Sequence, residues 1–309
     1  MLSAPGFSPQ PYDLARLDDF PSAFCLLPSA FCPFNMKREL TALVAAPLAI
    51  WMIRWANPYV FDAAMALVAA LALYEFLDLG RHKGYHLPIP LCIVVMLFII
   101  AAFILEPISV EMGVFVTLLV IPGWYVISGG NLEQALPSSA IAVLATLYVG
   151  MLGGSLIRLH DDFADGWKLV FFLLLVVWLG DSGAYYFGRT FGRHKLSPRI
   201  SPKKTVEGLI GGVISAVATA VIIHFTFFRN FPLLHVIIAG VILSLAGVIG
   251  DLAESMWKRS ADVKDSGTLL PGHGGFLDRF DSIFYTTPIL YVYWFLIIHD
   301  FKSFKIMSA

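Results

Sequence analysis

Charged residues are scarce in this sequence. Asp, Glu, Lys and Arg together make up only 14% of its 309 residues, whereas hydrophobic residues make up 58%. A soluble globular domain carries about 25% charged residues, so this composition excludes an ordinary soluble domain and predicts a membrane protein. The net charge of −1 leaves no surplus of basic residues for a nucleic-acid partner.

Cysteine is also rare, and several informative patterns are missing. The chain has Cys25, Cys32 and Cys92, which are too few and too scattered for a disulfide framework or a zinc site. No stretch alternates apolar and polar residues for long enough to predict a transmembrane β-barrel. The sequence also lacks the GxxxxGK[ST] motif, which excludes a P-loop nucleotide site.

The chain instead contains long apolar stretches, and about 20 such residues form a helix that spans a bilayer. The sequence therefore predicts an all-α fold, that of a polytopic membrane protein with about nine transmembrane helices. The stretches are residues 40–56, 58–79, 87–105, 107–128, 135–157, 167–187, 207–228, 232–254 and 282–300.

Basic residues predict the orientation of these helices. With the N-terminus in the cytoplasm, most Lys and Arg residues of the loops lie on the cytoplasmic side, as the positive-inside rule requires. The same placement puts the two richest polar loops, which follow the sixth and eighth stretches, on one face. The sequence thus predicts a multi-pass protein of the cell (inner) membrane whose active site faces the cytoplasm.

Three regions of the chain differ in composition. Residues 1–35 are Pro-rich, repeat the segment "PSAFC" and lack the basic start of a signal peptide. We expect them to be a disordered leader or to precede the true start at Met36, with an ordered amphipathic segment as the alternative. Residues 36–165 are predicted to form a transmembrane scaffold. Residues 166–309, in which polar residues enter the helix ends and loops, are predicted to form the catalytic core.

The first candidate site begins at Asp181, near the membrane boundary of the sixth apolar stretch. An ionisable group at this depth is costly and is therefore a functional candidate, although Asp181 could instead cap the helix in the headgroup layer. Six cations follow between Arg189 and Lys204. Such a loop most often sets the topology and contacts anionic lipid.

Topology alone does not explain the segment "SPKKT" within this loop. Ser201 and Pro202 fit the N-cap and the first position of a helix. Lys203 and Lys204 would then lie in the first turn, where cations oppose the helix dipole. A phosphate bound at the same helix end would offset this repulsion, so both lysines are candidate phosphate-binding residues.

Carboxylates recur at a spacing of three residues in two places. Asp251 and Glu254 share one helix face at the end of the eighth stretch, and Lys258 lies four residues beyond Glu254. This group is either an ion pair in the membrane interface or a carboxylate site for a metal. Asp278 and Asp281 repeat the spacing before the ninth stretch, and their hard oxygen atoms suit Mg2+ together with substrate phosphates.

A glycine-rich turn, "PGHGGF", precedes the second carboxylate pair. Gly272, Gly274 and Gly275 flank His273, and turns of this kind let backbone N–H groups approach phosphate oxygens. A lone His is more often structural than catalytic. Carboxylates, cations and this turn on one membrane face together fit metal-assisted phosphoryl or nucleotidyl transfer. An organic-anion transporter is the alternative from another class, but transporters place charges near the bilayer midplane.

The run from Ser255 to Asp281, "SMWKRSADVKDSGTLLPGHGGFLDRFD", resembles the signature of the phosphatidate cytidylyltransferase (CDP-diacylglycerol synthase) family. That signature has a Ser, a Lys-Arg pair, a Lys-Asp pair, a Pro/Gly before His-Gly-Gly, then Asp-Arg and a final Asp, and this chain has each of them. Residues 181–208 are similar to the family as well, and the resemblance extends over about residues 36–300.

The resemblance implies a Mg2+-dependent enzyme at the cytoplasmic face that makes CDP-diacylglycerol and diphosphate from CTP and phosphatidate within membrane lipid. A second metal, a monovalent cation, a homodimer and a different lipid phosphate as substrate are left open. Asp251 and Asp278 look like the metal ligands, with Asp281 in support. The implied catalytic residues are Asp251, Asp278, Asp281 and His273. The substrate-binding candidates are Lys203, Lys204, Lys258, Arg259, Lys264, Arg279, Gly274, Gly275 and Asp181.

Overall fold

The computed structural model describes residues 36–105, 107–129, 131–229, 231–267, 269 and 274–307. The prediction about the leader, residues 1–35, lies outside the described residues, as does the prediction for His273.

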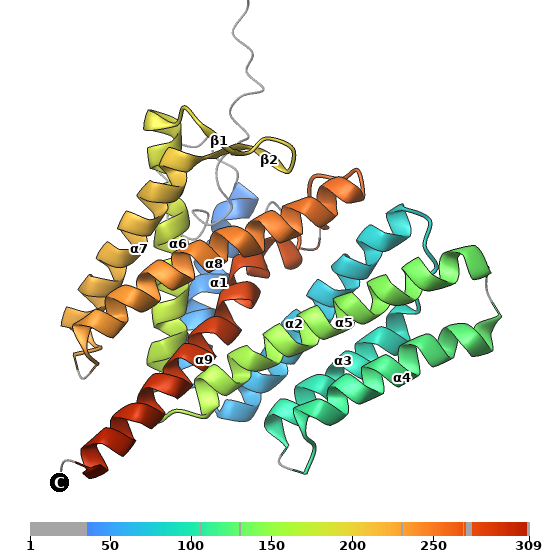
Figure 1. Ribbon diagram of the computed structural model, residues 1–309, viewed down its shortest axis with the longest axis horizontal. Coiled ribbons are helices and arrows are strands. Elements are labelled where there is room, and N and C mark those ends of the chain that lie inside the picture. Colours follow the sequence, from blue (N-terminus) through green and yellow to red (C-terminus); the bar gives the residue numbers. More distant parts are fainter. Residues whose placement is uncertain are drawn as a thin grey trace, which may run out of the picture.

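Helices dominate the described part of the chain, and a single two-stranded sheet accompanies them (Figure 1). In chain order the elements are α1 (Met36–Trp55), α2 (Pro58–His82), α3 (Ile89–Ile104), α4 (Val110–Ser128), α5 (Leu132–Asp161), α6 (Gly166–Phe191), β1 (Lys195–Ser197), β2 (Ser201–Thr205), α7 (Val206–Thr226), α8 (Leu233–Ser260) and α9 (Leu277–Met307). Each of the nine predicted apolar stretches overlaps one of these helices.

The prediction of an all-α polytopic membrane protein is confirmed. Within the described residues, seven helices are long and apolar enough to cross a membrane: α2, α4, α5, α6, α7, α8 and α9. Helix α3 is apolar but has only 16 residues. The number of nine membrane-spanning helices therefore stays a prediction.

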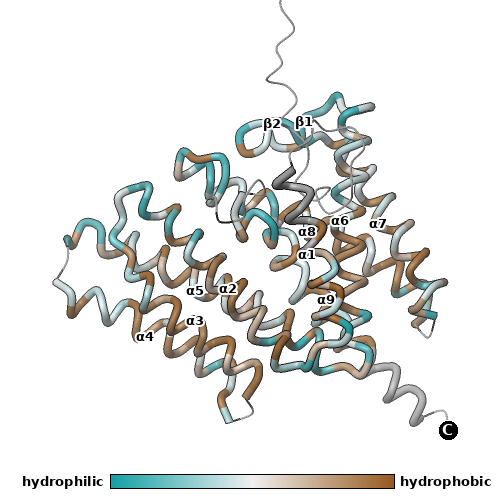
Figure 2. The backbone as a smooth tube through the Cα atoms, turned by 180° about the vertical axis from the view of Figure 1, so that it is seen from behind, coloured by the Kyte–Doolittle hydropathy of each residue, from teal (hydrophilic) through white to brown (hydrophobic). Residues whose placement is uncertain are grey.

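Two apolar cores hold the helices together. One is built mainly from α6, α7, α8 and the middle of α9, and includes Phe172 and Leu243. The other is built mainly from α2, α3 and α5, and includes Leu73 and Met96. Phe280 of α9 packs against both cores, so α9 joins the two halves of the bundle. Figure 2 shows the apolar residues along the middle of the helices and the polar residues gathered at their ends.

Helices α6 and α7 make the most extensive contact in the molecule because small residues line it. A Cβ on Gly183 would collide with the Ser215 side chain, and a Cβ on Gly211 would collide with Phe187. Glycine is needed at these positions for the helix backbones to approach this closely. The pair presents β1 and β2 at one end of the bundle (Figure 1).

The predicted helix start at "SPKKT" is wrong. Residues Ser201–Thr205 form strand β2, which pairs antiparallel with β1, and helix α7 begins only after it. Thr205 is the N-cap: its backbone is extended, and its hydroxyl accepts a hydrogen bond from Gly208 N at 3.1 Å. Pro202 is tolerated because a strand at the edge of a sheet need not donate every N–H. Lys203 and Lys204 thus lie on a strand, and the argument from the helix dipole does not apply to them.

Candidate active site

Three carboxylates converge where α8 ends and α9 begins. One oxygen atom from each of Asp251, Glu254 and Asp281 lies within 4.8 Å of the others. Asp251 and Glu254 share a face of α8 because they are three residues apart. Asp281 comes from α9, which packs closely on α8. We call these three residues the carboxylate cluster.

Two lysines contact the carboxylate cluster. Lys204, from β2, forms an ion pair with Asp251 at 2.6 Å. Lys258, one turn beyond Glu254 on α8, forms an ion pair with Glu254 at 2.6 Å. The interpretation of Glu254 and Lys258 as an ion pair is therefore confirmed, and it coexists with the metal-site geometry. Ser255 donates a further hydrogen bond to Asp251 at 3.1 Å.

Asp278 lies beside the carboxylate cluster and is oriented toward other donors. Its Oδ1 atom accepts a hydrogen bond from Lys258 Nζ at 2.6 Å. Its Oδ2 atom accepts hydrogen bonds from the backbone N–H groups of Ser266 at 3.0 Å and Gly275 at 2.9 Å. Lys258 therefore connects Asp278 to Glu254, and through it to the cluster. Among the described side chains, the cluster itself is formed by Asp251, Glu254 and Asp281, without Asp278.

The end of the glycine-rich turn, Gly274 and Gly275, packs against Asp278 and Glu75. Gly274 has φ of 78°, a left-handed conformation that other residues rarely adopt. Gly275 is buried, and a Cβ there would collide with Glu75 Oε2 and Ser266 Oγ. The turn therefore needs glycine at both positions.

Asp181 approaches the same region from the end of α6. It is half-buried, and it interacts electrostatically with Asp251 and Lys204. The structure thus brings together residues from α6, β2, α8 and α9 that the sequence suggested separately. Asp181 and Asp251 are both acidic, so Lys204 beside them reduces the repulsion between their charges.

The remaining predicted cations differ in their placement. Lys203 and Lys264 are exposed, Arg279 is half-buried in the first turn of α9, and its guanidinium approaches Gly274. Arg259 donates a hydrogen bond to the backbone carbonyl of Val263 at 3.2 Å, within the loop after α8. Of the predicted cations, Lys204 and Lys258 make the ion pairs with the acidic residues described above.

The sequence suggested Glu254 only as part of an ion pair or a metal site, and it gave no role to Glu75. Glu75 lies on α2 and is buried, with only 1% of its surface exposed. It accepts hydrogen bonds from Ser266 Oγ at 3.0 Å and from Leu277 N at 2.9 Å. An ionisable residue inside an apolar stretch was the available signal, because such a group is costly unless it has a partner.

The chemistry of the carboxylate cluster suits a hard divalent cation. Magnesium prefers carboxylate oxygens and substrate phosphates as ligands. The cluster offers three carboxylates and no Cys or His ligand. The residues present therefore fit Mg2+, which the sequence resemblance implies.

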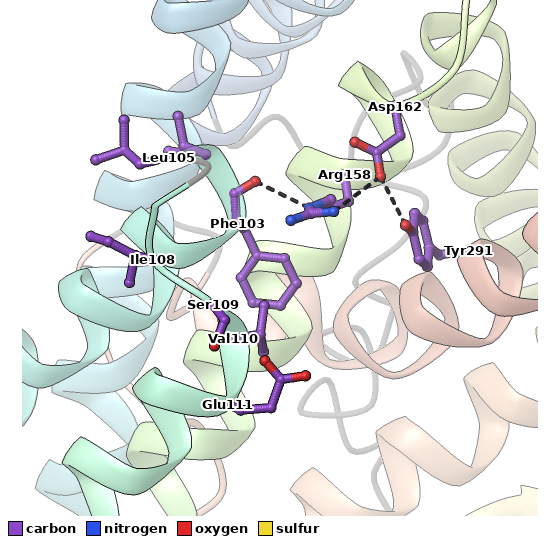
Figure 3. A pocket seen from close by; sticks show the side chains of 10 residues that line it. Phe103, Leu105, Ile108, Ser109, Val110, Glu111, Arg158, Asp162 and Tyr291 are labelled. Carbon is purple, nitrogen blue, oxygen red and sulfur yellow. Dashed lines mark hydrogen bonds and ion pairs between the residues drawn. The ribbon is translucent and has the colours of Figure 1, made fainter.

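A cavity of about 630 Å³ lies away from this site, between the end of α5 and the start of α4 (Figure 3). Arg158 Nε donates a hydrogen bond to the Phe103 carbonyl at 3.1 Å, and Arg158 forms an ion pair with Asp162 at 3.6 Å. Tyr291 donates to Asp162 at 2.8 Å. Tyr291 is ten residues beyond Asp281 on α9, which is about 15 Å along a helix. None of the predicted site residues lines this cavity.

Comparison with known proteins places the chain in an enzyme family. Residues 36–297 match the model of the cytidylyltransferase family. The chain is 34% identical over 263 residues to the phosphatidate cytidylyltransferase of Bacillus subtilis (strain 168), which covers 83% of this chain and 97% of that protein. It is 31% identical over 261 residues to that of Staphylococcus epidermidis, covering 82% of this chain and 96% of the relative. It is 38% identical to that of Staphylococcus saprophyticus over 152 residues, or 49% of this chain and 57% of the relative.

Proposed function

The chain belongs to the cytidylyltransferase family, and on that premise we propose that it transfers the cytidylyl group of CTP to phosphatidate. The products are CDP-diacylglycerol and diphosphate. The observation that carries the proposal is the carboxylate cluster, which Lys204 and Lys258 contact. The chain also resembles the phosphatidate cytidylyltransferases of Bacillus subtilis and Staphylococcus epidermidis over almost the full length of those proteins.

The reaction needs no covalent enzyme intermediate because phosphatidate already carries a nucleophilic phosphate. One of its oxygen atoms attacks the α-phosphorus of CTP, the new P–O bond forms, and the bond from the α-phosphorus to the diphosphate oxygen breaks. Charge balances without a proton transfer when both substrates are fully ionised. The protein's task is therefore to position two highly charged substrates and to offset their charge.

Asp251, Glu254 and Asp281 would hold a divalent cation in this proposal, and Asp278 is retained from the family resemblance as a further ligand. When bound, Mg2+ supplies positive charge that stabilises the leaving diphosphate. Asp278 in this structure accepts bonds from Lys258, Ser266 and Gly275. Its part as a ligand stays a prediction.

Lysines and backbone groups would orient the phosphates. Lys204 and Lys258 already contact the acidic residues, so each can offset negative charge at the same place when phosphates enter. Lys203, on the exposed side of β2, and Arg279, in the first turn of α9, are the next candidates. The backbone at Gly274, in its left-handed conformation, is a further candidate for contact with phosphate oxygens. The Gly275 N–H already donates a hydrogen bond to Asp278.

We further propose that the site faces the cytoplasm. Strands β1 and β2, which carry Lys195, Lys203 and Lys204, lie at one end of the bundle (Figure 1), and Lys204 contacts Asp251 of the carboxylate cluster. The positive-inside rule places such a basic end in the cytoplasm. Nine membrane-spanning helices would then put the N-terminus inside and the C-terminus outside.

Purified protein in detergent tests the activity directly. With Mg2+, CTP and phosphatidate, we expect release of diphosphate and formation of CDP-diacylglycerol, and we expect a chelator to abolish both. Absence of diphosphate release under these conditions would overturn the proposal. The alternative substrate is another lipid phosphate, such as that of an ether lipid. A competition assay between this lipid and phosphatidate shows which of the two the enzyme uses.

A further inference from the structure

Glu75 stands apart from the reaction described above, yet it contacts the catalytic region. It lies on α2, in the half of the chain predicted to be scaffold, and its side chain is buried. Its hydrogen-bond partners, Ser266 and Leu277, are 191 and 202 residues away in the sequence. A buried carboxylate is costly unless it is well satisfied, so this contact needs an explanation.

The two partners of Glu75 flank residues 267–276, the segment of the α8–α9 loop that leads into α9. Ser266 lies six residues after the end of α8, and Leu277 is the first residue of α9. The same carboxylate oxygen, Oε2, accepts a hydrogen bond from both. Glu75 therefore joins the ends of the segment that contains the glycine-rich turn.

Glu75 also acts as a cap for α9. The first N–H groups of a helix have no partner within the helix, and a negative charge at this end is favourable. The Leu277 N–H is such a group, and Glu75 supplies the acceptor from a different helix. Asp278 follows Leu277 directly, and Asp281 lies three residues further on. The direction and position of the helix that carries both residues thus depend on this contact.

Asp278 also contacts residues of this loop. It accepts backbone hydrogen bonds from Ser266 and Gly275, while it also binds Lys258. The close approach of Gly275 to Glu75 leaves no room for a side chain at that position. The loop ends are therefore held between two carboxylates, one from α2 and one from α9.

Further contacts join α2 to this region. Phe76, next to Glu75, packs on Trp257 of α8 with ring centroids 4.5 Å apart. Lys83, just beyond the end of α2, forms an ion pair with Asp262 in the loop after α8. These contacts hold α2 against the end of α8. The position of Glu75 relative to the loop after α8 is therefore fixed by packing as well as by its own hydrogen bonds.

We propose that Glu75 is a positioning residue for the active site, which holds Ser266 of the α8–α9 loop beside the start of α9 at Leu277 and so orients Asp278 and Asp281. It contacts no reacting atom in this proposal and acts through the backbone of the loop. The inference rests on the proposed function for its effect on turnover, and on the geometry alone for its effect on the loop.

Replacement of Glu75 tests the inference by kinetics. Glu75→Ala removes both hydrogen bonds, and we expect kcat to fall about 100-fold with little change in KM for CTP, because a displacement of about 1 Å at a catalytic group has this effect. Glu75→Gln keeps one acceptor oxygen and should recover part of the loss. Ser266→Ala removes only one bond and should show a smaller decrease.

Asp62 provides the matched control. It is a second buried carboxylate on α2, 5% exposed, and lies 13 residues before Glu75, or about 20 Å along the helix. Asp62→Ala should leave kcat within about twofold of the unmodified protein, given the distance from the site. Wild-type kcat in Glu75→Ala, or an equal loss in Asp62→Ala, would overturn the inference. If Glu75→Ala does not fold, Glu75→Gln and Ser266→Ala decide by the same criterion.

Hydrogen–deuterium exchange separates this inference from the proposed function. Glu75→Gln should increase exchange in the peptides that contain Ser266 and Leu277, and should leave those of β1 and β2 unchanged. Unchanged exchange at Ser266 and Leu277 would overturn the role of Glu75 even in an active enzyme. If the unmodified protein releases no diphosphate but the exchange increases as expected, the proposed function fails and the structural role of Glu75 stands.

Discussion

The two ends of the helix bundle hold their ionisable side chains in different ways. Where α8 meets α9, Asp251, Glu254 and Asp281 crowd together, and the carboxylates outnumber the lysines that contact them. Near the cavity of Figure 3, which Glu111 also lines, Arg158 forms an ion pair with Asp162, and Tyr291 donates a hydrogen bond to the same carboxylate. A balanced network of this second kind is explained by structure alone. In the first arrangement Glu254 is buried and Asp251 and Asp281 are half-buried. Carboxylates that outnumber their cations at such a place are unfavourable without a further cation, so this arrangement indicates a binding site.

The largest effect is expected from the carboxylate cluster. Asp251→Asn removes one of three clustered charges, and we expect turnover to fall about 1,000-fold, because metal charge stabilisation is worth several kcal/mol. Diphosphate release measured across a Mg2+ titration checks this. Asp162→Asn, at the other end of the bundle, is the matched control and should stay near wild type. Equal losses in the two variants would remove the distinction between the ends.

Asp278→Asn tests the two roles open to that residue. Its hydrogen bonds to Ser266 and Gly275 and its proposed place as a metal ligand both predict a loss of about 100-fold or more. A ligand role predicts partial recovery at high Mg2+, whereas a role in loop geometry alone predicts a low kcat at every Mg2+ concentration. Full activity in this variant would remove Asp278 from the site.

Lys258→Met leaves Glu254 and Asp278 without their shared cation. Glu254 is buried, with 1% of its side chain exposed, and Lys258 is 12% exposed. Breaking a buried pair by removing one partner costs about 3–5 kcal/mol, so a clear decrease in the thermal unfolding midpoint is expected. The double variant Lys258→Met with Glu254→Gln should regain part of the stability, because it removes one of the two uncompensated charges. No regain would contradict the pairing.

Lys204→Ala should have a smaller effect, mainly on substrate use. The lysine and Asp251 are both partly exposed, so their ion pair contributes at most about 1 kcal/mol to folding. A charged hydrogen bond to a phosphate is worth about 1.5–3 kcal/mol, so KM for CTP or phosphatidate should rise about tenfold or more. The exposed Lys195, on the neighbouring strand β1, is the control. Unchanged KM values would mean that the basic segment between α6 and α7 only sets the membrane topology.

The smallest effect is expected at the other end of the bundle. Arg158→Gln weakens the contacts with Asp162 and Phe103, and we expect a loss of about 1 kcal/mol in stability with turnover within about twofold. Thermal unfolding and diphosphate release check the two expectations. A large loss of turnover would show that the two ends do not differ in function as proposed here.

The helices and the residues that share a helix face could be predicted, because each depends on the length of an apolar stretch or on the spacing of residues within one helix. Apolar stretches of bilayer length predict helices, since backbone polar groups must be satisfied inside a membrane. A spacing of three residues places Asp251 and Glu254 on one face of a helix, whatever the rest of the fold does. The segment "SPKKT" was predicted wrongly because local preference for a helix start competed with pairing to Lys195–Ser197, and the strand pair prevailed.

The sequence by itself determined the class of protein, the approximate helices and the segments that carry carboxylates and lysines, because each depends on composition or on spacing within one element. Only the tertiary structure decided which of these residues meet. Lys204 of β2 forms an ion pair with Asp251 of α8, although helix α7 separates them in the sequence. Glu75 accepts hydrogen bonds from Ser266 and Leu277, which are 191 and 202 residues away. Such contacts depend on how helices pack, and packing is a property of many side chains together rather than of a local pattern.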